Sequence, residues 1–95
     1  MRYNVEYTDT FDGEANYSWV LRAIITMPEL THYGYDGSTN YSKANQIYKR
    51  ELMRKAKDVF GLGGVRGSVS RYGDMIEFRP YGSATVLFIS ENCGQ

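Results

Sequence analysis

The stretch that decides the fold is 41-YSKANQIYKRELMRKAKDVF-60. Its apolar residues recur at spacings of three and four, the pattern of one apolar stripe along an α-helix. These residues are Ala44, Ile47, Tyr48, Leu52, Ala56, Val59 and Phe60. Asn40 or Ser42 can cap the start, and Gly61 can end the helix in the left-handed conformation that glycine allows. We therefore predict a helix over residues 41–60.

Two strand-like segments precede this helix. Residues 2–8 alternate between apolar and polar side chains, which is typical of a half-buried strand. Residues 17–26 are largely β-branched and aromatic and favour a second strand, apolar on both faces around Ile24-Ile25. Between them, residues 9–16 are rich in turn formers, and Asp12-Gly13 is the strongest turn signal. We expect a hairpin that ends shortly before Pro28, because proline cannot donate to a sheet.

Three short strands are expected after the helix. They cover residues 65–72, 75–79 and 84–90, separated by turn signals at Gly73-Asp74 and at residues 80–83. The last strand is apolar on both faces, which places it centrally in the sheet. The expected order is ββαβββ, in a single α+β domain over residues 1–95. One helix packs on one face of an antiparallel sheet of four or five strands.

Composition argues for a binding protein without catalytic machinery. The chain has 95 residues, of which 15% are aromatic, with nine tyrosines. Tyrosine suits half-buried sheets and contact surfaces alike. Catalysis by serine or cysteine needs a neighbouring base and an orienting group, but His32 is the sole histidine and Cys93 the sole cysteine. We expect no catalytic residues, no metal and no cofactor, and a reducing cytoplasm without a membrane span.

Charge is unevenly spread although the net charge is zero. Residues 1–40 hold six acids and two bases, whereas residues 41–60 hold six bases and two acids. The cations of the helix could contact the phosphates of a nucleic acid; they are Lys43, Lys49, Arg50, Arg54, Lys55 and Lys57. The alternative is a solvated face that balances the acidic first part of the chain. A nucleic-acid-binding module is therefore one hypothesis.

Two other segments are candidates for contact with a protein partner. The first is the acidic hairpin turn, with carboxylates that could meet a basic groove; they are Asp9, Asp12 and Glu14. The second is residues 31–39, within a loop over residues 28–40 that is long for a small domain. This segment carries aromatic side chains between glycines. Its expected contact residues are His32, Tyr33, Tyr35 and Asp36. The alternative for the loop is a spacer whose tyrosines fold back over the core.

Three stretches carry a resemblance to known proteins. They are 7-YTDTFDGEANYSWV-20, 59-VFGLGGVR-66 and 79-RPYGSATVLFI-89. With these stretches the chain resembles small uncharacterised proteins of bacteriophages and mobile elements. The shared motifs carry no known chemistry, so the resemblance transfers no site residues.

That resemblance implies a class of function. Small phage proteins include many inhibitors of host defence, such as anti-CRISPR proteins. Our first hypothesis is a non-enzymatic inhibitor in the cytoplasm of a bacterial host. Such a protein would bind a CRISPR–Cas protein or complex and block nucleic-acid binding or nuclease recruitment. A phage structural or accessory interaction protein is a further alternative.

Overall fold

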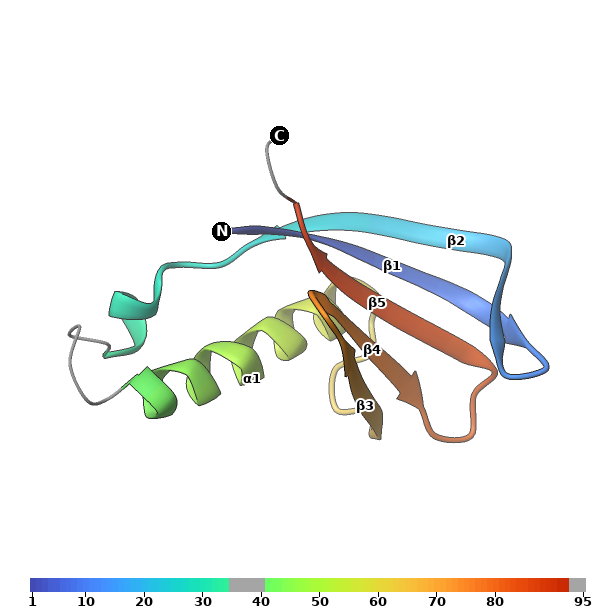
Figure 1. Ribbon diagram of the computed structural model, residues 1–95. Coiled ribbons are helices and arrows are strands. Elements are labelled where there is room, and N and C mark those ends of the chain that lie inside the picture. Colours follow the sequence, from blue (N-terminus) through green and yellow to red (C-terminus); the bar gives the residue numbers. More distant parts are fainter. Residues whose placement is uncertain (35–40, 93–95) are drawn as a thin grey trace.

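The computed structural model describes residues 1–34 and 41–92, where one long helix lies against an antiparallel sheet of five strands (Figure 1). The strand order across the sheet is β2-β1-β5-β4-β3. The elements are β1 (Arg2–Phe11), β2 (Glu14–Thr26), the 3-10 helix η1 (Leu30–Tyr33), α1 (Tyr41–Val59), β3 (Gly67–Tyr72), β4 (Met75–Pro80) and β5 (Thr85–Glu91). The predicted α+β class and the predicted order of elements are confirmed.

Strand β5 is the middle of the sheet, as its sequence predicted. It pairs with β1 on one side and with β4 on the other. Val86, Leu87 and Ile89 are almost fully buried, because a central strand covered by two neighbours loses the most apolar surface to water. The pairing sets Leu87 opposite Tyr7 of β1 and opposite Phe78 of β4. β5 thus joins the first two strands to the last two.

The helix packs on one face of the sheet, against side chains of β1, β2, β4 and β5. Leu52 and Ala56 enter the core beside Val5, Ile25 and Met27. The hydroxyls of Tyr3 and Tyr48 are hydrogen-bonded at 2.8 Å, and burial raises the pKa of Tyr3 above its ordinary value. At its end α1 is closed by Gly61, which has the expected positive φ of 73°. The predicted cap is therefore confirmed, and α1 ends one residue before the predicted limit.

The β1–β2 hairpin is longer than predicted. We expected turn structure over residues 9–16, but the turn is only Asp12-Gly13 and the strands run up to it. Both turn residues have positive φ, as a tight two-residue hairpin connection requires. The prediction was wrong because the turn formers around Asp9 and Asn16 build a bulge within the hairpin, described below.

Strand β2 is also less buried than its composition suggested. Ile25 is 7% exposed, whereas Ile24 is 58% exposed. The two apolar faces of the strand are present as predicted, but only one is buried, because β2 lies at the edge of the sheet and the helix covers one of its faces. β3 is the other edge and begins at Gly67 rather than at residue 65. A Cβ at Gly67 would meet the Arg79 carbonyl oxygen at 2.3 Å, so glycine is needed there.

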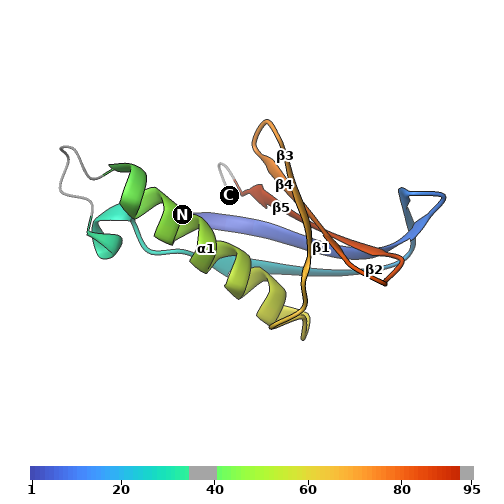
Figure 2. The ribbon, with the colours of Figure 1, turned by 90° about the horizontal axis from the view of Figure 1, so that it is seen from below.

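The helix does not cover the whole sheet. In Figure 2, α1 and β3 diverge from the loop that joins them, residues 60–66. β3 and β4 therefore rise away from the helix on one side, and the long hairpin of β1 and β2 extends beyond the end of α1 (Figure 1). This divergence leaves part of the helix-facing side of β3 and β4 open.

Candidate functional site: a basic groove between the helix and the sheet edge

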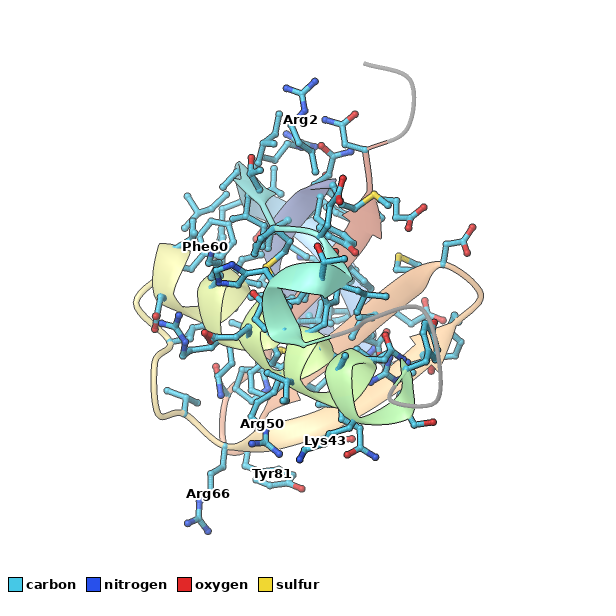
Figure 3. The ribbon with its side chains drawn as sticks, turned by 90° about the vertical axis from the view of Figure 1, so that its left-hand side faces the viewer. Arg2, Lys43, Arg50, Phe60, Arg66 and Tyr81 are labelled. Carbon is cyan, nitrogen blue, oxygen red and sulfur yellow. The ribbon has the colours of Figure 1, made fainter. Side chains whose placement is uncertain are left out.

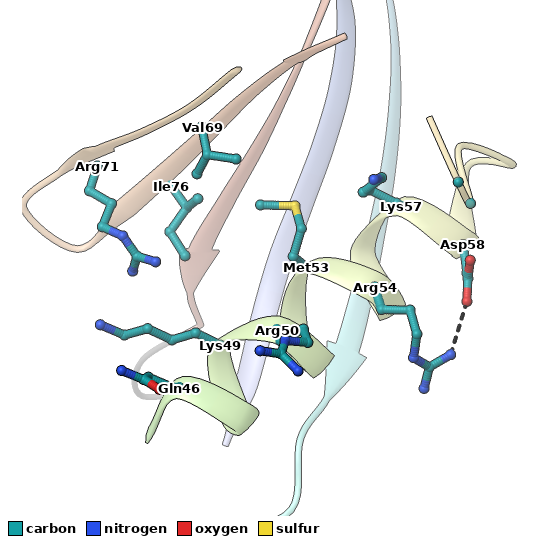
Figure 4. A pocket seen from close by; sticks show the side chains of 12 residues that line it. Gln46, Lys49, Arg50, Met53, Arg54, Lys57, Asp58, Val69, Arg71 and Ile76 are labelled. Carbon is teal, nitrogen blue, oxygen red and sulfur yellow. Dashed lines mark hydrogen bonds and ion pairs between the residues drawn. The ribbon is translucent and has the colours of Figure 1, made fainter. Parts of the chain in front are cut away.

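A groove of about 910 Å³ lies where α1 diverges from β3 and β4. That volume is at the upper end of the range of ligand-binding pockets, about 300 to 1,000 Å³. Its lining comes from the helix, from the two strands and from the loop that joins them, namely Gln46, Lys49, Arg50, Met53, Arg54, Lys57, Asp58, Gly63, Gly64, Val69, Arg71 and Ile76. We call this feature the basic groove (Figure 4).

The helix turns one flank toward the groove. Gln46, Lys49, Met53 and Lys57 recur at spacings of three and four, which puts them on one side of a helix, and Arg50 lies beside this stripe. β3 supplies Arg71 from the opposite wall. The lining holds five cationic side chains and one carboxylate, a local excess of four positive charges in a chain of zero net charge.

Two of the five cationic side chains already interact with other residues of the protein. Arg54 forms ion pairs with Glu51 at 2.6 Å and with Asp58 at 3.1 Å. These carboxylates, Glu51 first, raise the pKa of Arg54 above its ordinary value. Lys57 Nζ donates a hydrogen bond of 2.5 Å to the Val65 carbonyl oxygen and lies 4.8 Å from the centre of the Phe78 ring. Both side chains therefore serve the fold.

The other three cations have no such partner within the described part of the chain. Lys49, Arg50 and Arg71 make no ion pair or side-chain hydrogen bond there. Figure 4 shows Lys49 and Arg71 reaching from α1 and β3 into the space between these elements. Three unneutralised cations from two walls converge on one concavity. Arginine adds a planar fork of donors that matches a phosphate in two places.

The floor of the groove is apolar. Met53 from α1, Val69 from β3 and Ile76 from β4 face one another across it (Figure 4). Val69 is 48% exposed, so this floor is accessible to a ligand. The groove thus combines an apolar base with positive walls.

The groove continues into a smaller hollow near the β3–β4 turn. Lys49, Arg71 and Ile76 line both concavities. The smaller one, about 310 Å³, also carries Asp74 and Glu91. Carboxylates therefore border the positive region at this end, and the cationic stretch runs from Lys49 along the helix toward its C-terminal end.

The sequence-based prediction included most of the cationic residues of this site but not all of them. Of the predicted nucleic-acid contacts, the groove includes Lys49, Arg50, Arg54 and Lys57. Lys43 lies on α1 outside the lining (Figure 3), and Lys55 Nζ donates to the Thr26 carbonyl oxygen at 3.3 Å. Arg71 was missed, because no local pattern on a strand indicates which helix it faces. The alternation of β3, which puts Val69 and Arg71 on one face, was the available signal.

Asp9, a predicted partner contact, organises a bulge in the hairpin. Thr8 pairs with Val20 and Thr10 with Ala15, so the four residues 16–19 of β2 stand opposite Asp9 alone. The Asp9 carboxylate accepts hydrogen bonds from Asn16 Nδ2 at 3.0 Å and from the backbone N–H and hydroxyl of Ser18. These bonds, the Ser18 hydroxyl first, lower the pKa of Asp9 to about 2.

The bulge re-aims an aromatic side chain, as bulges commonly do. Trp19 packs edge-on against Tyr7, with ring centres 5.3 Å apart, and Tyr7 stacks on Phe60 at 5.7 Å. Leu21, opposite Tyr7 in the hairpin, is 50% exposed. The motif over residues 7–20 therefore forms a bulge and an exposed apolar surface.

The remaining predicted contacts are spread over the molecule. Asp12 and Glu14 are exposed at the hairpin tip beside Phe11, which is 74% exposed. His32 is exposed on η1 and packs edge-on against Tyr33, which in turn contacts the ring of Tyr48 at 5.8 Å. None of these residues lines the basic groove, although Tyr33 lies close enough to Arg54 of its wall to interact with it electrostatically. Tyr35 and Asp36 lie outside the described residues, as does Cys93.

The described residues contain neither a metal-binding cluster nor a membrane-spanning helix. Within residues 1–34 and 41–92, no three side chains among His, Cys, Asp and Glu gather closely enough to hold a metal ion. No helix in the same ranges is both long and apolar enough to cross a membrane. Comparisons with protein-family models, with curated proteins and with solved structures found no significant match.

Proposed function

We propose that the protein is a non-enzymatic binding protein whose basic groove holds a nucleic acid by its phosphates. The observation that carries this proposal is the convergence of Lys49, Arg50 and Arg71, without carboxylate partners among the described residues, on one accessible concavity. Like charges held close together repel each other, and nothing in the packing of α1 or β3 requires them. A polyanion relieves that repulsion and releases its own counterions.

A net charge of zero does not argue against this binding. The excess of carboxylates lies in residues 1–40, with Asp12 and Glu14 at the far end of the hairpin and Glu6 paired with Arg22 on the opposite face of the sheet. Exposed charges separated by more than about 8 Å are largely screened from one another at physiological salt. The local field at the groove therefore decides the electrostatic attraction.

Salt-titrated fluorescence anisotropy with labelled oligonucleotides tests the proposal. Three phosphate contacts predict that the logarithm of the affinity falls against the logarithm of the salt concentration with a slope of roughly two to three. Arg50→Glu/Arg71→Glu should weaken binding by roughly tenfold or more and flatten the slope. Lys43→Glu/Arg66→Glu changes the net charge equally outside the groove and is the matched control. Equal losses in both double variants would contradict the proposal.

A second function is favoured by the hairpin. We propose as the alternative that the protein inhibits a host defence system, such as a CRISPR–Cas complex, by binding a protein component. The supporting observation is the number of large apolar side chains that the hairpin exposes, since Phe11, Tyr17, Trp19 and Leu21 are each 42% exposed or more. Aromatic anchors of this kind dominate protein interfaces, and Asp12 and Glu14 would add carboxylates at the tip for a basic target.

A phage plating assay on hosts with active CRISPR–Cas systems tests this alternative. The wild-type protein should restore plating, and Leu21→Ser with Trp19→Ala should abolish the effect. Ile24→Ser is the control, because Ile24 is also exposed, at 58%, but on the other face of the same strand. If the hairpin variants still restored plating but Arg50→Glu/Arg71→Glu did not, the inhibitory surface would be the groove and not the hairpin.

A further inference from the structure

We infer that the basic groove selects a single-stranded nucleic acid and excludes a duplex. This inference rests on the proposed function of the groove and specifies its ligand. It follows from three features of the groove: the direction in which its cations point, the nature of its floor and the space around α1.

The free cations point into the groove. Lys49 and Arg50 come from the flank of α1 that faces β3, and Arg71 comes from β3 itself. A ligand must enter between these two elements to contact both walls (Figure 4). A flexible single strand can lay its backbone along such a concavity, as strands do in positively charged channels.

The space around α1 opposes a duplex. The major groove of DNA is about 12 Å wide and admits one α-helix or one two-stranded ribbon. Here the cationic flank of α1 has the β3–β4 hairpin beside it across the groove. Entry of that flank into a major groove would bring the hairpin along with it, and the two elements together exceed the available width.

The apolar floor favours exposed bases. Met53, Val69 and Ile76 form a base to which a phosphate has no affinity. A duplex presents phosphates and sugars on its outside and keeps the faces of its bases stacked within. A single strand can turn the faces of its bases onto apolar side chains while its phosphates meet the cations. The combination of floor and walls therefore matches the two surfaces of a single strand.

The extent of the site predicts a weak, short contact. The free cations of α1, Lys49 and Arg50, are neighbours in the sequence and face Arg71 of β3. Asp74 and Glu91 border the positive region at the end near the β3–β4 turn. Three phosphate contacts with a single strand give an expected salt slope of about two. The groove would hold a short stretch of strand with little dependence on base sequence.

The experiment compares one mixed-sequence oligonucleotide as a single strand and as its duplex, in DNA and in RNA form, at several salt concentrations. We expect the single strand to bind at least tenfold more tightly than the duplex, with unlabelled polyglutamate as a poor competitor. Val69→Thr keeps a β-branched residue in the edge strand but makes the floor polar. It should weaken single-strand binding by roughly threefold to tenfold and leave the salt slope unchanged. Ile24→Thr, an apolar-to-threonine substitution on the uncovered face of β2, should have no effect.

The outcomes separate the inference from the proposed function. Equal or tighter binding of the duplex would overturn the inference and leave the proposed function standing. Absence of binding to either form would overturn both. Polyglutamate that competes as well as nucleic acid at equal charge would also overturn both, because the groove would then accept an acidic peptide. Thermal melts of each variant, followed by circular dichroism, confirm that a loss of binding is not a loss of fold.

Discussion

The hairpin bulge and the basic groove differ in whether their charged side chains have partners within the protein. At the bulge, the Asp9 carboxylate is fully engaged by Asn16 and Ser18 of its own hairpin. At the groove, Lys49, Arg50 and Arg71 have no such partner in the described ranges. A charge that is satisfied internally shapes the fold, whereas a cluster of like charges left open is available to a ligand. Asp9 therefore has a structural role in the hairpin, whereas the three basic residues form the candidate nucleic-acid site.

The largest expected effect comes from the strand that joins the two regions. Leu87 is completely buried in β5, between β1 and β4. Leu87→Ala should lower the free energy of unfolding by about 2 to 5 kcal/mol, because it removes apolar contacts and leaves a cavity. Urea denaturation followed by circular dichroism measures this. If only one region lost structure while the other unfolded as before, the two would not share one cooperative core.

A substitution at the bulge should affect stability without affecting the groove. Thr8 is fully buried and donates a hydrogen bond of 2.7 Å to the Trp19 carbonyl oxygen. Thr8→Val keeps the shape but removes the donor, at an expected cost of about 1 to 3 kcal/mol in unfolding free energy. Denaturation and anisotropy on the same sample give both quantities. A parallel loss of nucleic-acid affinity in the folded variant would contradict the separation of the two regions.

Within the groove, the held cation and the free cation should behave differently. Lys57→Met removes the hydrogen bond to the Val65 carbonyl and the contact with the Phe78 ring, so we expect a loss of about 1 kcal/mol in unfolding free energy. Lys49→Met should leave stability nearly unchanged but lower the salt slope of binding by about 0.7, the contribution of one phosphate contact with a single strand. Identical behaviour of the two variants would refute the division into held and free cations.

The smallest expected effect is a dependence of hairpin stability on acid. The Asp9 pKa is lowered to about 2 by the Ser18 and Asn16 hydrogen bonds, from about 3.9 in an unfolded chain. The contribution of the carboxylate is fully present above about pH 4 and is lost as the pH falls through about 2. Asp9→Asn should therefore show a shallower loss of thermal stability than the wild type between pH 4 and pH 2. A loss of the same steepness would show that other groups control the acid response.

The sequence by itself determined the elements and their order. The spacing of apolar residues over 41–60 specified α1 and its apolar face, and the unbroken apolar run of Val86 to Ile89 specified a central strand. Both signals are local, because a helix or a buried strand needs its pattern only within its own length. The Asp12-Gly13 turn and the Gly61 cap are local in the same sense, and the structure has both.

Only the tertiary structure decided what the polar residues do. Asp9 and Arg71 are ordinary charged residues in the sequence. Asp9 stabilises the bulge because the hairpin brings Asn16 and Ser18 to its carboxylate. Arg71 lines the groove because β3 diverges from α1. The partners of a charge are set by strand register and by the angle between packed elements. The register and the angle depend on contacts between residues distant in sequence, so no local sequence pattern predicts them.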